Sequence, residues 1–382
     1  VYKRQTQRAV DNFPISGIKM DFPFTKSFIT SLGLIKDAAA RANLRLKLLP
    51  ANKARAISRA AKEVWKEKHH DQFPIDVFQT GSGTSSNMNA NEVIANLASK
   101  NSKLNIGPND DVNMSQSSND VIPTAIKISA HIDLTKKLYP ALDKLINEIQ
   151  TKAKSLKGVT KTGRTHLMDA MPIDFSDELL AWSSQLSACR NMLEVIEERF
   201  LELPQGGTAV GSGINAHKQF AKFFAQEMSK ILETKRKYIP SNNFFHELSA
   251  QDCSVQLSGE LKNLAVILMK ISNDLRWMNS GPLAGLSEIE LQALQPGSSI
   301  MPGKVNPVIP EAVTMVSADV IGNDTSITVA AQAGNFQLNV MLPVIAYNLL
   351  KSINLLAGAM NVLSNKDIKT FKVNMKNLES SL

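Results

Sequence analysis

The chain has 382 residues, of which 43% are hydrophobic and 20% are charged, a balance typical of a globular protein with a large core. Its formal net charge of +8 suits an enzyme that acts on small anions. The sequence has no arginine-rich run and no basic segment interleaved with aromatic residues, so nucleic acid is not an expected partner. The lysines are scattered along helical stretches, where we expect them on solvated faces.

Cysteine and apolar patterns constrain the compartment. Cys189 and Cys253 lie in helical, apolar surroundings without a CxxC motif, so we expect free thiols in a reducing compartment. No stretch approaches 18 consecutive apolar residues, and we expect no membrane span. Residues 1–4 lack the apolar core of a secretory signal. The sequence therefore favours a cytoplasmic protein, or a mitochondrial-matrix protein in a eukaryote.

The first part of the chain is predicted to be helical. Composition predicts helices over residues 29–49 and 53–68, with Pro50 as the break between them. His69 and His70 follow the second helix, and adjacent histidines point in different directions. We interpret them as a solvated helix end, where cations are favourable, rather than as metal ligands.

Two polar clusters of small residues each precede a predicted helix. Ser82, Gly83 and Thr84 come before a helix predicted over residues 91–98. Ser117 to Asn119 come before a second helix, which Asp120 is predicted to cap. Hydroxyls and backbone N–H groups in such places can hold carboxylates, but for the first cluster, taken alone, a Ser/Thr-rich linker or an ordinary helix cap is the better explanation.

Between residues 121 and 360 the sequence predicts long helices. Apolar residues recur at spacings of three and four along residues 134–149, 179–203, 257–275 and 342–360. A narrow apolar stripe sustained over several turns is typical of bundle packing. The expected fold class is therefore an all-α, long-helix bundle. Residues 162–172, which contain His166, are expected to form a loop between two of these helices.

Residues 297–307, GSSIMPGKVNP, form a predicted loop rich in Gly and Pro just before a helix that contains Glu311. Lys304 supplies a cation, Asn306 a neutral donor, and Ser298 or Ser299 a hydroxyl. These groups are the ones needed to remove a proton from a carbon beside a carboxylate, because the developing anion needs donors and positive charge. The alternative is a flexible surface loop.

The run GSSIMPGKVNPVIPE over residues 297–311 resembles the signature loop of the fumarase/aspartase superfamily. The GSGT and NMNANEV motifs, the SSND motif, and the GRTHL motif are similar to class II fumarase segments, and the likeness covers residues 5–380. Aspartases typically carry Gln in place of His166, and GNF at residues 334–336 is the fumarase form. The resemblance thus favours a fumarase over an aspartase.

The resemblance implies a homotetramer with a twenty-helix core, in which three chains share each active site. It implies reversible, metal-independent hydration of fumarate to (S)-malate, with a small dicarboxylate as ligand and no cofactor. The six histidines show no HxxxH or HxH spacing, so no metal site is predicted. We expect an N-terminal helical domain over 1–112 with an incomplete start, a bundle domain over 113–361, and over 362–382 the beginning of a C-terminal domain that is otherwise missing.

The resemblance also implies roles for individual residues. Ser298 takes the C3 proton of malate, and Lys304 with Asn306 holds the resulting aci-carboxylate. His166, paired with Glu311, handles the water that leaves C2. The implied substrate-binding residues are Ser82, Gly83, Thr84, Ser117, Ser118, Asn119, Thr165, Ser299, Lys304 and Asn306.

A peripheral anion site of the family lies near residues that correspond to Asn109 and Asp110. This chain has Leu104 and Gly107 where relatives usually carry Arg and His, so we expect that site to be weak or absent. Two other functions stay open. One is an aspartate ammonia-lyase of the same superfamily, against which His166 and Asn335 argue; the other is an inactive helical scaffold or binding protein.

Overall fold

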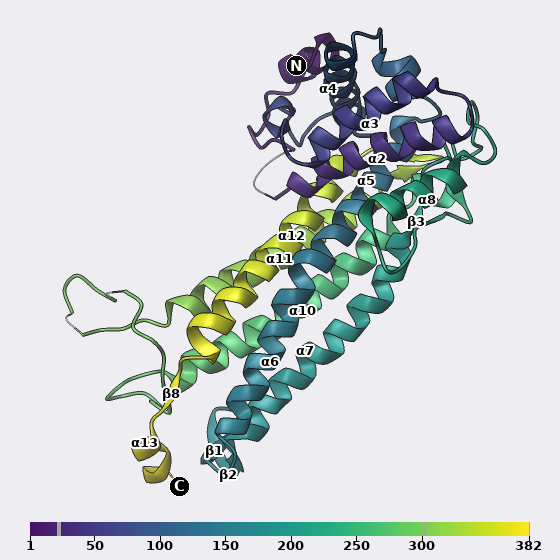
Figure 1. Cartoon of the computed structure of the whole chain (residues 1–382). Helices are drawn as coiled ribbons and strands as arrows, with labels where there is room; N and C mark the ends of the chain where they lie inside the picture. The colour runs from purple at the N-terminus through teal and green to yellow at the C-terminus, as the bar shows by residue number, and fades with distance from the viewer. Residues whose placement is uncertain (21–23, 296, 302, 382) are drawn as a thin grey trace. The chain divides into compact units, whose positions relative to one another are not determined.

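The computed structural model describes residues 1–20, 24–295, 297–301 and 303–381, and these are predominantly helical (Figure 1). The helices are α1 (Arg4–Asn12), α2 (Lys26–Arg45), α3 (Ala51–Trp65), α4 (Thr84–Ser102), α5 (Ser118–Asp133), α6 (Tyr139–Ser155), α7 (Phe175–Glu197), α8 (Phe220–Leu232), α9 (Phe244–Ser249), α10 (Asp252–Met278), α11 (Val308–Ala331), α12 (Leu342–Leu363) and α13 (Met375–Ser380). The all-α fold class is confirmed.

Short strands form four two-stranded pairs within the described residues. The longest pair is the antiparallel hairpin of β1 (Thr160–Thr165) and β2 (Met168–Asp174). The others are β3 (Glu202–Leu203) with β4 (Ile239–Pro240), β5 (Ile289–Glu290) with β8 (Lys372–Val373), and β6 (Gly334–Asn335) with β7 (Leu338–Asn339).

The chain divides into two compact units, each assembled from three segments. The first contains residues 1–134, 195–258 and 323–351, and α2 lies at its centre against α3, α5 and α8. Phe28, Ile29 and Leu32 of α2 are almost completely buried. At Gly33 a Cβ atom would lie 2.8 Å from the backbone nitrogen of Trp65, so glycine is required where α2 and α3 approach each other.

The second unit contains residues 135–194, 259–322 and 352–382. Its segments of α6, α7, α10, α11 and α12 run side by side (Figure 1). The parts of the predicted stripes that lie in this unit form its core, because their apolar residues are buried at successive turns. The fully buried members include Leu142, Leu145, Ile149, Leu179, Leu186, Leu193, Leu261, Leu264, Leu268, Ile271, Leu275, Ile353, Leu356 and Met360.

The N-terminal helices occur where composition predicts them, with shifted ends. The predicted helix over 29–49 is α2, and that over 53–68 is α3, with Pro50 as its N-cap. The predicted helix over 91–98 begins earlier, at Thr84, because Gly83 adopts φ +74° and turns the polar run directly into α4. The domain boundaries near residues 112 and 361 stay a prediction.

The expected loop over residues 162–172 is a β-hairpin instead. His166 and Leu167 form its two-residue turn with φ 57° and φ 59°. Two successive residues with positive φ match the twist of the flanking strands, as in a type I′ turn. The β-branched Thr160, Thr162 and Thr165 favour the extended backbone of β1.

One helical stretch, Leu342–Ile368, is long and apolar enough by length and composition to cross a membrane. Of its most apolar 18-residue window, 61% is buried inside the protein. A helix in the core of a bundle meets the same criterion, so we interpret this stretch as core packing.

Candidate active site

The signature loop is closed by hydrogen bonds between its two ends. Gly297 N donates to Lys304 O at 2.9 Å, and Asn306 Nδ2 donates to Gly297 O at 2.9 Å. A Cβ atom at Gly297 would lie 2.2 Å from Lys304 O, so only glycine permits this closure. Asn306 uses one N–H for the loop, and its amide carries a second N–H. Pro302 of this loop lies outside the described residues.

Ser298 directly follows Gly297, at the start of this loop. Its Oγ accepts hydrogen bonds from the backbone N–H groups of Ile300 and Met301, both at 3.2 Å. Donors aimed at an oxygen favour its anionic form over its neutral form. The loop therefore supplies part of the stabilisation that a serine alkoxide needs. Ser299, the next residue, is exposed.

A cavity of about 1090 Å³ lies beside this loop in the second unit. Lys304, Asn306 and Glu311 all contribute to its lining, together with Asn279 and Asn374. Glu311 is half-buried in the first turn of α11, where a carboxylate is favourable at the positive end of the helix dipole. Three of the five predicted catalytic residues thus line one cavity.

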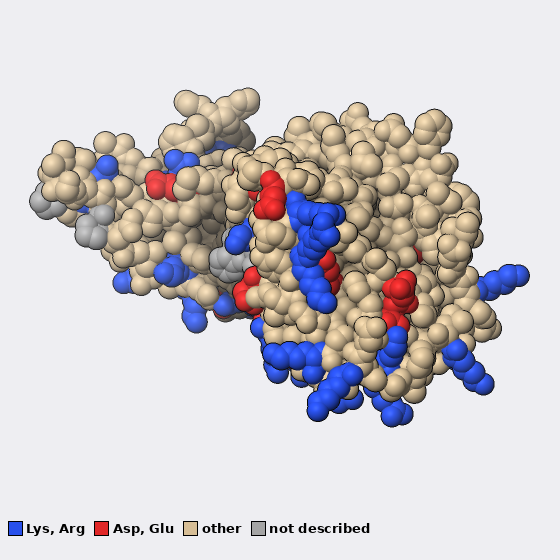
Figure 2. Space-filling model, turned by 90° about the horizontal axis from the view of Figure 1, so that it is seen from above, with Lys and Arg blue, Asp and Glu red and all other residues tan. Residues whose placement is uncertain are grey.

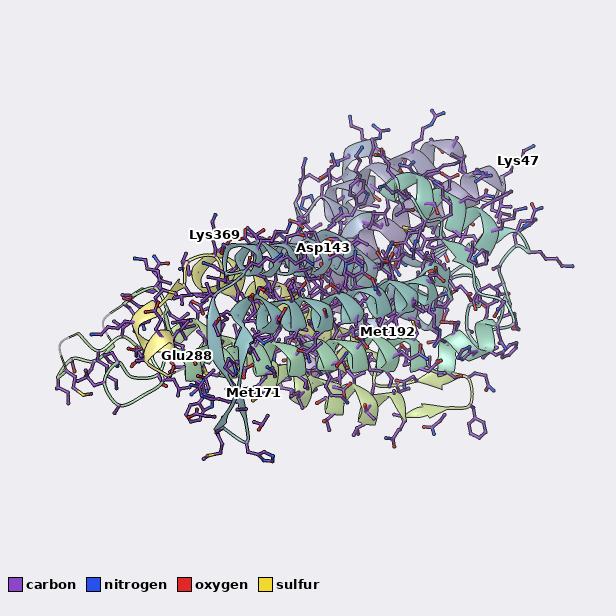
Figure 3. All side chains as sticks on the ribbon, turned by 90° about the horizontal axis from the view of Figure 1, so that it is seen from below. Lys47, Asp143, Met171, Met192, Glu288 and Lys369 are labelled. Carbon is purple, nitrogen blue, oxygen red and sulfur yellow. The ribbon has the colours of Figure 1, made fainter. Side chains whose placement is uncertain are left out.

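His166 and Thr165 lie at the end of the β1–β2 hairpin, and both are exposed. Within the described residues of this single chain, the His166 side chain has no hydrogen-bond partner, and its predicted pairing with Glu311 is not formed. Neighbouring apolar side chains are exposed as well: Leu167 by 66%, Met168 by 70% and Met171 by 77%. Figure 3 labels Met171 on this hairpin.

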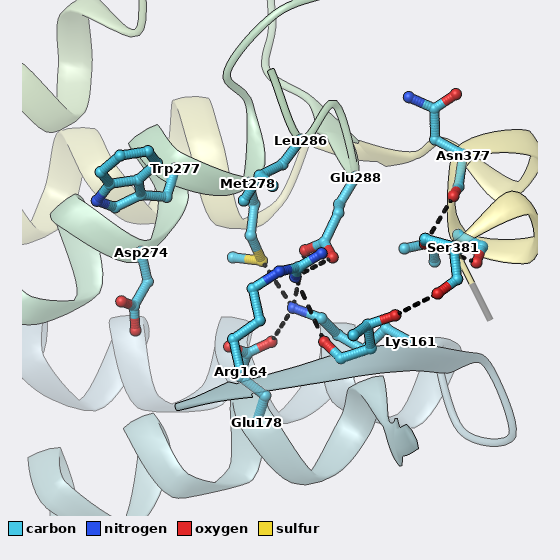
Figure 4. Close-up of polar contacts among 12 residues, drawn as sticks. Lys161, Arg164, Glu178, Asp274, Trp277, Met278, Leu286, Glu288, Asn377 and Ser381 are labelled. Carbon is cyan, nitrogen blue, oxygen red and sulfur yellow. Dashed lines mark hydrogen bonds and ion pairs between the residues drawn. The ribbon is translucent and has the colours of Figure 1, made fainter. Parts of the chain in front are cut away.

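A buried cluster of ion pairs holds the base of the hairpin (Figure 4). Arg164 Nη1 lies 2.5 Å from Glu288 Oε1, and Lys161 Nζ lies 2.7 Å from Glu178 Oε2 and 2.9 Å from Glu288 Oε2. Glu288 is only 1% exposed. Because buried charges must be paired, this cluster fixes the strand that carries Thr165 and His166.

The other predicted substrate-binding residues lie in the first unit. Ser82 Oγ and Thr84 Oγ1 are 2.8 Å apart, on either side of Gly83. Ser82 is buried, whereas Thr84 is half-buried at the first position of α4. The three residues form the N-terminal end of α4, where unpaired N–H groups favour an anion.

Ser117, Ser118 and Asn119 form the start of α5. Ser117 is the N-cap and makes a capping box with Asp120, which confirms the predicted cap. Asn119 Nδ2 donates to Ala209 O at 2.8 Å. The glycine-rich turn that contains Ala209 therefore serves as a structural support for this cluster.

Asp120 ties the cluster to the same turn. Its carboxylate accepts backbone N–H groups from Ser117 at 2.9 Å, Gly206 at 3.0 Å and Thr208 at 2.9 Å. Burial raises the pKa of Asp120 to about 6, while these N–H donors and the charge of Lys36 act in the opposite direction. The carboxylate is thus a fixed part of the scaffold behind Ser118.

A buried lysine also supports Ser118, and sequence reasoning missed it. Lys36 Nζ donates to Asn113 Oδ1 at 3.0 Å and to Gln116 Oε1 at 2.9 Å. Asn87 Nδ2 bonds Asn113 Oδ1 at 3.3 Å and Ser118 Oγ at 2.9 Å. Lys36 is fully buried, so the expectation of solvated lysines is wrong at this position.

The residues expected near the peripheral anion site are exposed. Asn109 and Asp110 lie in a single π-helical turn, Pro108–Val112. The next residue, Asp111, pairs with Lys53 at 2.9 Å and accepts Gly107 N at 2.8 Å. The weakness of this site stays a prediction.

Two further sequence expectations concern metals and thiols. No group of three or more His, Cys, Asp or Glu side chains that could hold a metal ion occurs in residues 1–20, 24–295, 297–301 and 303–381. Cys189 and Cys253 are buried and free, and burial raises the pKa of both thiols, that of Cys253 to about 12. Both are therefore packing residues.

Comparison with known proteins shows the family of this chain. A family model described as a lyase matches residues 1–322. "Fumarate hydratase class II 2" of Pseudomonas aeruginosa is 54% identical over 382 residues, which is 100% of this chain and 82% of the relative. "Fumarate hydratase class II" of Bacillus subtilis is 45% identical over 383 residues, covering 99% of this chain and 82% of the relative.

Solved structures agree in fold. The crystal structure of recombinant class II fumarase from Schistosoma mansoni matches with a TM-score of 0.96 and 36% identity, over 100% of this chain and 83% of that one. A fumarate lyase:delta crystallin from Brucella melitensis, solved bound to cobalt, matches with a TM-score of 0.95 and 42% identity, over 100% and 83%. The chain therefore belongs to the lyase family and, within it, to the class II fumarate hydratases.

Proposed function

We propose that this protein is a hydro-lyase that hydrates fumarate reversibly to (S)-malate through an aci-carboxylate intermediate. The observation that carries the proposal is the signature loop, where Ser298 Oγ accepts two backbone N–H groups and Lys304, Asn306 and Glu311 line the adjacent cavity. The relatives at 45% to 54% identity support the same reaction.

In the direction from malate to fumarate, the Ser298 alkoxide removes the C3 proton. The electron pair of the C–H bond moves into the neighbouring carboxylate, which becomes the doubly charged aci-carboxylate. The ammonium of Lys304 and the second N–H of Asn306 stabilise that charge. The pair then forms the C2–C3 double bond as hydroxide leaves C2 and takes a proton from His166, which gives water and fumarate.

The substrate carboxylates need neutral donors as well as charge. The hydroxyls of Thr84, Ser117 and Ser118 and the amide of Asn119 supply them in this proposal, with Thr165 and Ser299 beside the reacting groups. The supports found behind Ser118 hold its hydroxyl in one orientation, which lowers the entropy lost on binding.

The exposed hairpin supports a shared site in a homotetramer. His166 has no partner among the described residues of its own chain, and three apolar side chains surround it in the open. Bundle helices also expose apolar residues: Val266 by 52%, Met315 by 68% and Met192, labelled in Figure 3, by 49%. Burial of such surface drives association. Light scattering is expected to give the mass of four chains, and a stable, fully active monomer would contradict the shared site.

The reaction is tested by following the ultraviolet absorbance of fumarate with the purified chain and malate. We expect fumarate to form from malate, and no ammonia to form from L-aspartate. Release of ammonia from L-aspartate would identify an ammonia-lyase, and absence of both reactions in the tetramer would identify a scaffold. We propose the cytoplasm, or the matrix in a eukaryote, as its compartment, because the buried thiols are free. Activity in the membrane fraction after cell fractionation would contradict this.

A further inference from the structure

A second cavity, of about 530 Å³, opens between α2, α3 and α8 within the first unit, and arginines dominate its lining. Arg41 and Arg45 come from α2, and Arg55 and Arg59 come from α3. None of the residues proposed for fumarate chemistry lines this cavity. Its function is therefore separate from that of the candidate active site.

The arginines of α2 have acidic partners. Arg41 Nε lies 2.7 Å from Asp37 Oδ1, and the fully buried Asp37 also accepts Trp65 Nε1 at 3.2 Å. Arg45 Nη1 lies 2.8 Å from Glu227 Oε1. These two guanidinium groups are held in place by their carboxylates, so they line the cavity in fixed positions.

The arginines of α3 lack such partners. Neither Arg55 nor Arg59 has a carboxylate within ion-pair distance in the part of the chain that the structure describes, and both are exposed. Within the described residues, the pair makes one side-chain hydrogen bond, from Arg59 Nε to Arg55 O at 3.4 Å. Like charges four residues apart destabilise a helix, so the fold gains nothing from this pair. Arg55 and Arg59 thus add two positive charges to the cavity that no carboxylate of the described residues pairs.

The cavity also has an apolar part. Leu44 and the buried Ala54 contribute to its lining between the arginines. The guanidinium carbon of Arg45 lies 4.0 Å from the centroid of the Phe223 ring, and this contact fixes the plane of its donors.

Figure 2 shows the face of the first unit that α2, α3 and α4 form. Lys and Arg side chains gather along the lower edge of this face.

We propose that this cavity binds an organic phosphate, a molecule with a phosphoryl group of at least two negative charges on an apolar body. Guanidinium groups present paired N–H donors that match two phosphoryl oxygens at once. The two guanidinium groups without a carboxylate partner supply the charge opposite to that of the phosphoryl group. The apolar lining suits the apolar body of the ligand. Inorganic phosphate has no such body.

The test is calorimetric titration of the purified protein with adenosine diphosphate, inorganic pyrophosphate and adenosine. We expect saturable binding of adenosine diphosphate, weaker binding of pyrophosphate, and none of adenosine. The affinity should fall as NaCl rises from about 0.05 to about 0.3 M, because salt screens exposed charges. Equal affinity for adenosine would overturn the proposal, and so would the absence of any binding of adenosine diphosphate.

Matched variants locate the site. The double variant Arg55→Gln/Arg59→Gln removes the two unpaired charges and should weaken adenosine diphosphate at least about tenfold. The control Lys62→Gln/Lys66→Gln removes two exposed charges from the C-terminal end of the same helix, outside the cavity, and should bind like the parent. The proposal is overturned if the arginine variant binds like the parent or the lysine control loses the same affinity. Hydratase activity is measured in a separate assay, so a failure of the proposed hydratase function is distinguished from a failure of phosphate binding.

Discussion

Lys36 Nζ donates a hydrogen bond to Asn113 Oδ1 at 3.0 Å, at the centre of a chain of side chains that ends on the Ser118 hydroxyl. Both acceptors that touch the ammonium, Asn113 and Gln116, are neutral oxygens. A cation without a carboxylate in contact is costly to bury. Burial accordingly lowers the pKa of Lys36 to about 7, and the charge of Asp120 opposes this only in part.

This lowered pKa predicts how stability depends on pH. The pKa of Lys36 is about 7 in the folded chain, against an ordinary value of 10.5, so the unfolded chain binds more protons between these limits. Stability therefore rises with pH in this window, and the full cost of the buried charge is present below pH 7. Lys36→Met removes this dependence. We expect the parent to gain up to about 1.4 kcal/mol per pH unit relative to the variant.

Urea unfolding of the parent and of Lys36→Met is compared between pH 7 and 10. This range starts at the lowered pKa of Lys36, which is about 7. Asp120 titrates near pH 6, below the window, so it contributes little to the slope. Lys62→Met, on an exposed position of α3, is the control and should follow the parent at every pH. Parallel curves for the parent and Lys36→Met would contradict the prediction.

The ion cluster under the hairpin predicts a large effect from one carboxylate. Glu288→Gln leaves Arg164 without its buried partner and Lys161 with Glu178 alone. Removal of one member of a buried ion pair costs about 3 kcal/mol or more. We expect this loss in the free energy of unfolding, measured with urea. Glu290→Gln, two residues along and exposed, should change it by less than about 0.5 kcal/mol; equal losses would show that the pairs contribute little.

The helices and their apolar stripes could be predicted, because the periodicity of apolar residues is a local property of the sequence. Apolar residues occur at every third or fourth position from Leu261 to Leu275, and this spacing places them on one face of the helix, which is buried. The β1–β2 hairpin could not, because its turn is His166-Leu167 rather than the Asn-Gly that normally marks positive φ at two residues. Positive φ at bulky residues is strained, and such strain concentrates at functional sites.

The loop residues of the candidate site could also be predicted, but their supports could not. Lys304, Asn306 and Glu311 are close in sequence, so a single loop and helix start brings them to one cavity. Lys36 lies in an Ala-rich segment, where the sequence alone predicts a solvated lysine. Its burial follows from the packing of α2 in the core, which the sequence does not show. The contact of Asp120 with Thr208 joins residues 88 positions apart, a distance that only the tertiary fold determines.

Chelation should leave activity unchanged. The chemistry proposed here uses Ser298, Lys304 and His166, and the described residues contain no cluster with a metal-ligand donor set. We expect dialysis against EDTA to preserve kcat for malate. Loss of turnover that magnesium or iron restores would contradict the proposed mechanism.

The peripheral anion site should bind malate weakly or not at all. Leu104 and Gly107 place no cation beside Asn109 and Asp110, and Asp110 adds negative charge. A crystal soaked in malate should show ligand density at Ser298 and little near Asn109. Ligand density of equal strength at both places would show that a cation is not required there.

The last prediction separates the roles of Ser298 and His166, which act on different bonds. Ser298→Ala retains the closed loop but removes the oxygen that accepts the Ile300 and Met301 N–H groups. It should lower kcat by about 10²–10⁴-fold, the range of a general base, with a smaller change in KM. His166→Asn keeps a polar group at the hairpin tip, lowers kcat, and flattens the limb of the pH–rate profile that reports imidazole ionisation. If both residues only position groups in a polar cleft, either variant changes kcat by less than about tenfold and leaves the profile unchanged.

Exchange of the C3 hydrogen of malate with solvent deuterium tests the base directly. Only the group that removes this proton is needed for exchange, because the aci-carboxylate forms before the C2–O bond breaks. Ser298→Ala should therefore lose exchange together with turnover. His166→Asn should retain more exchange than turnover, since its step follows proton removal. If Ser298→Ala exchanges at the parent rate, another group removes the proton, and the two backbone N–H groups on Ser298 Oγ serve only to shape the loop.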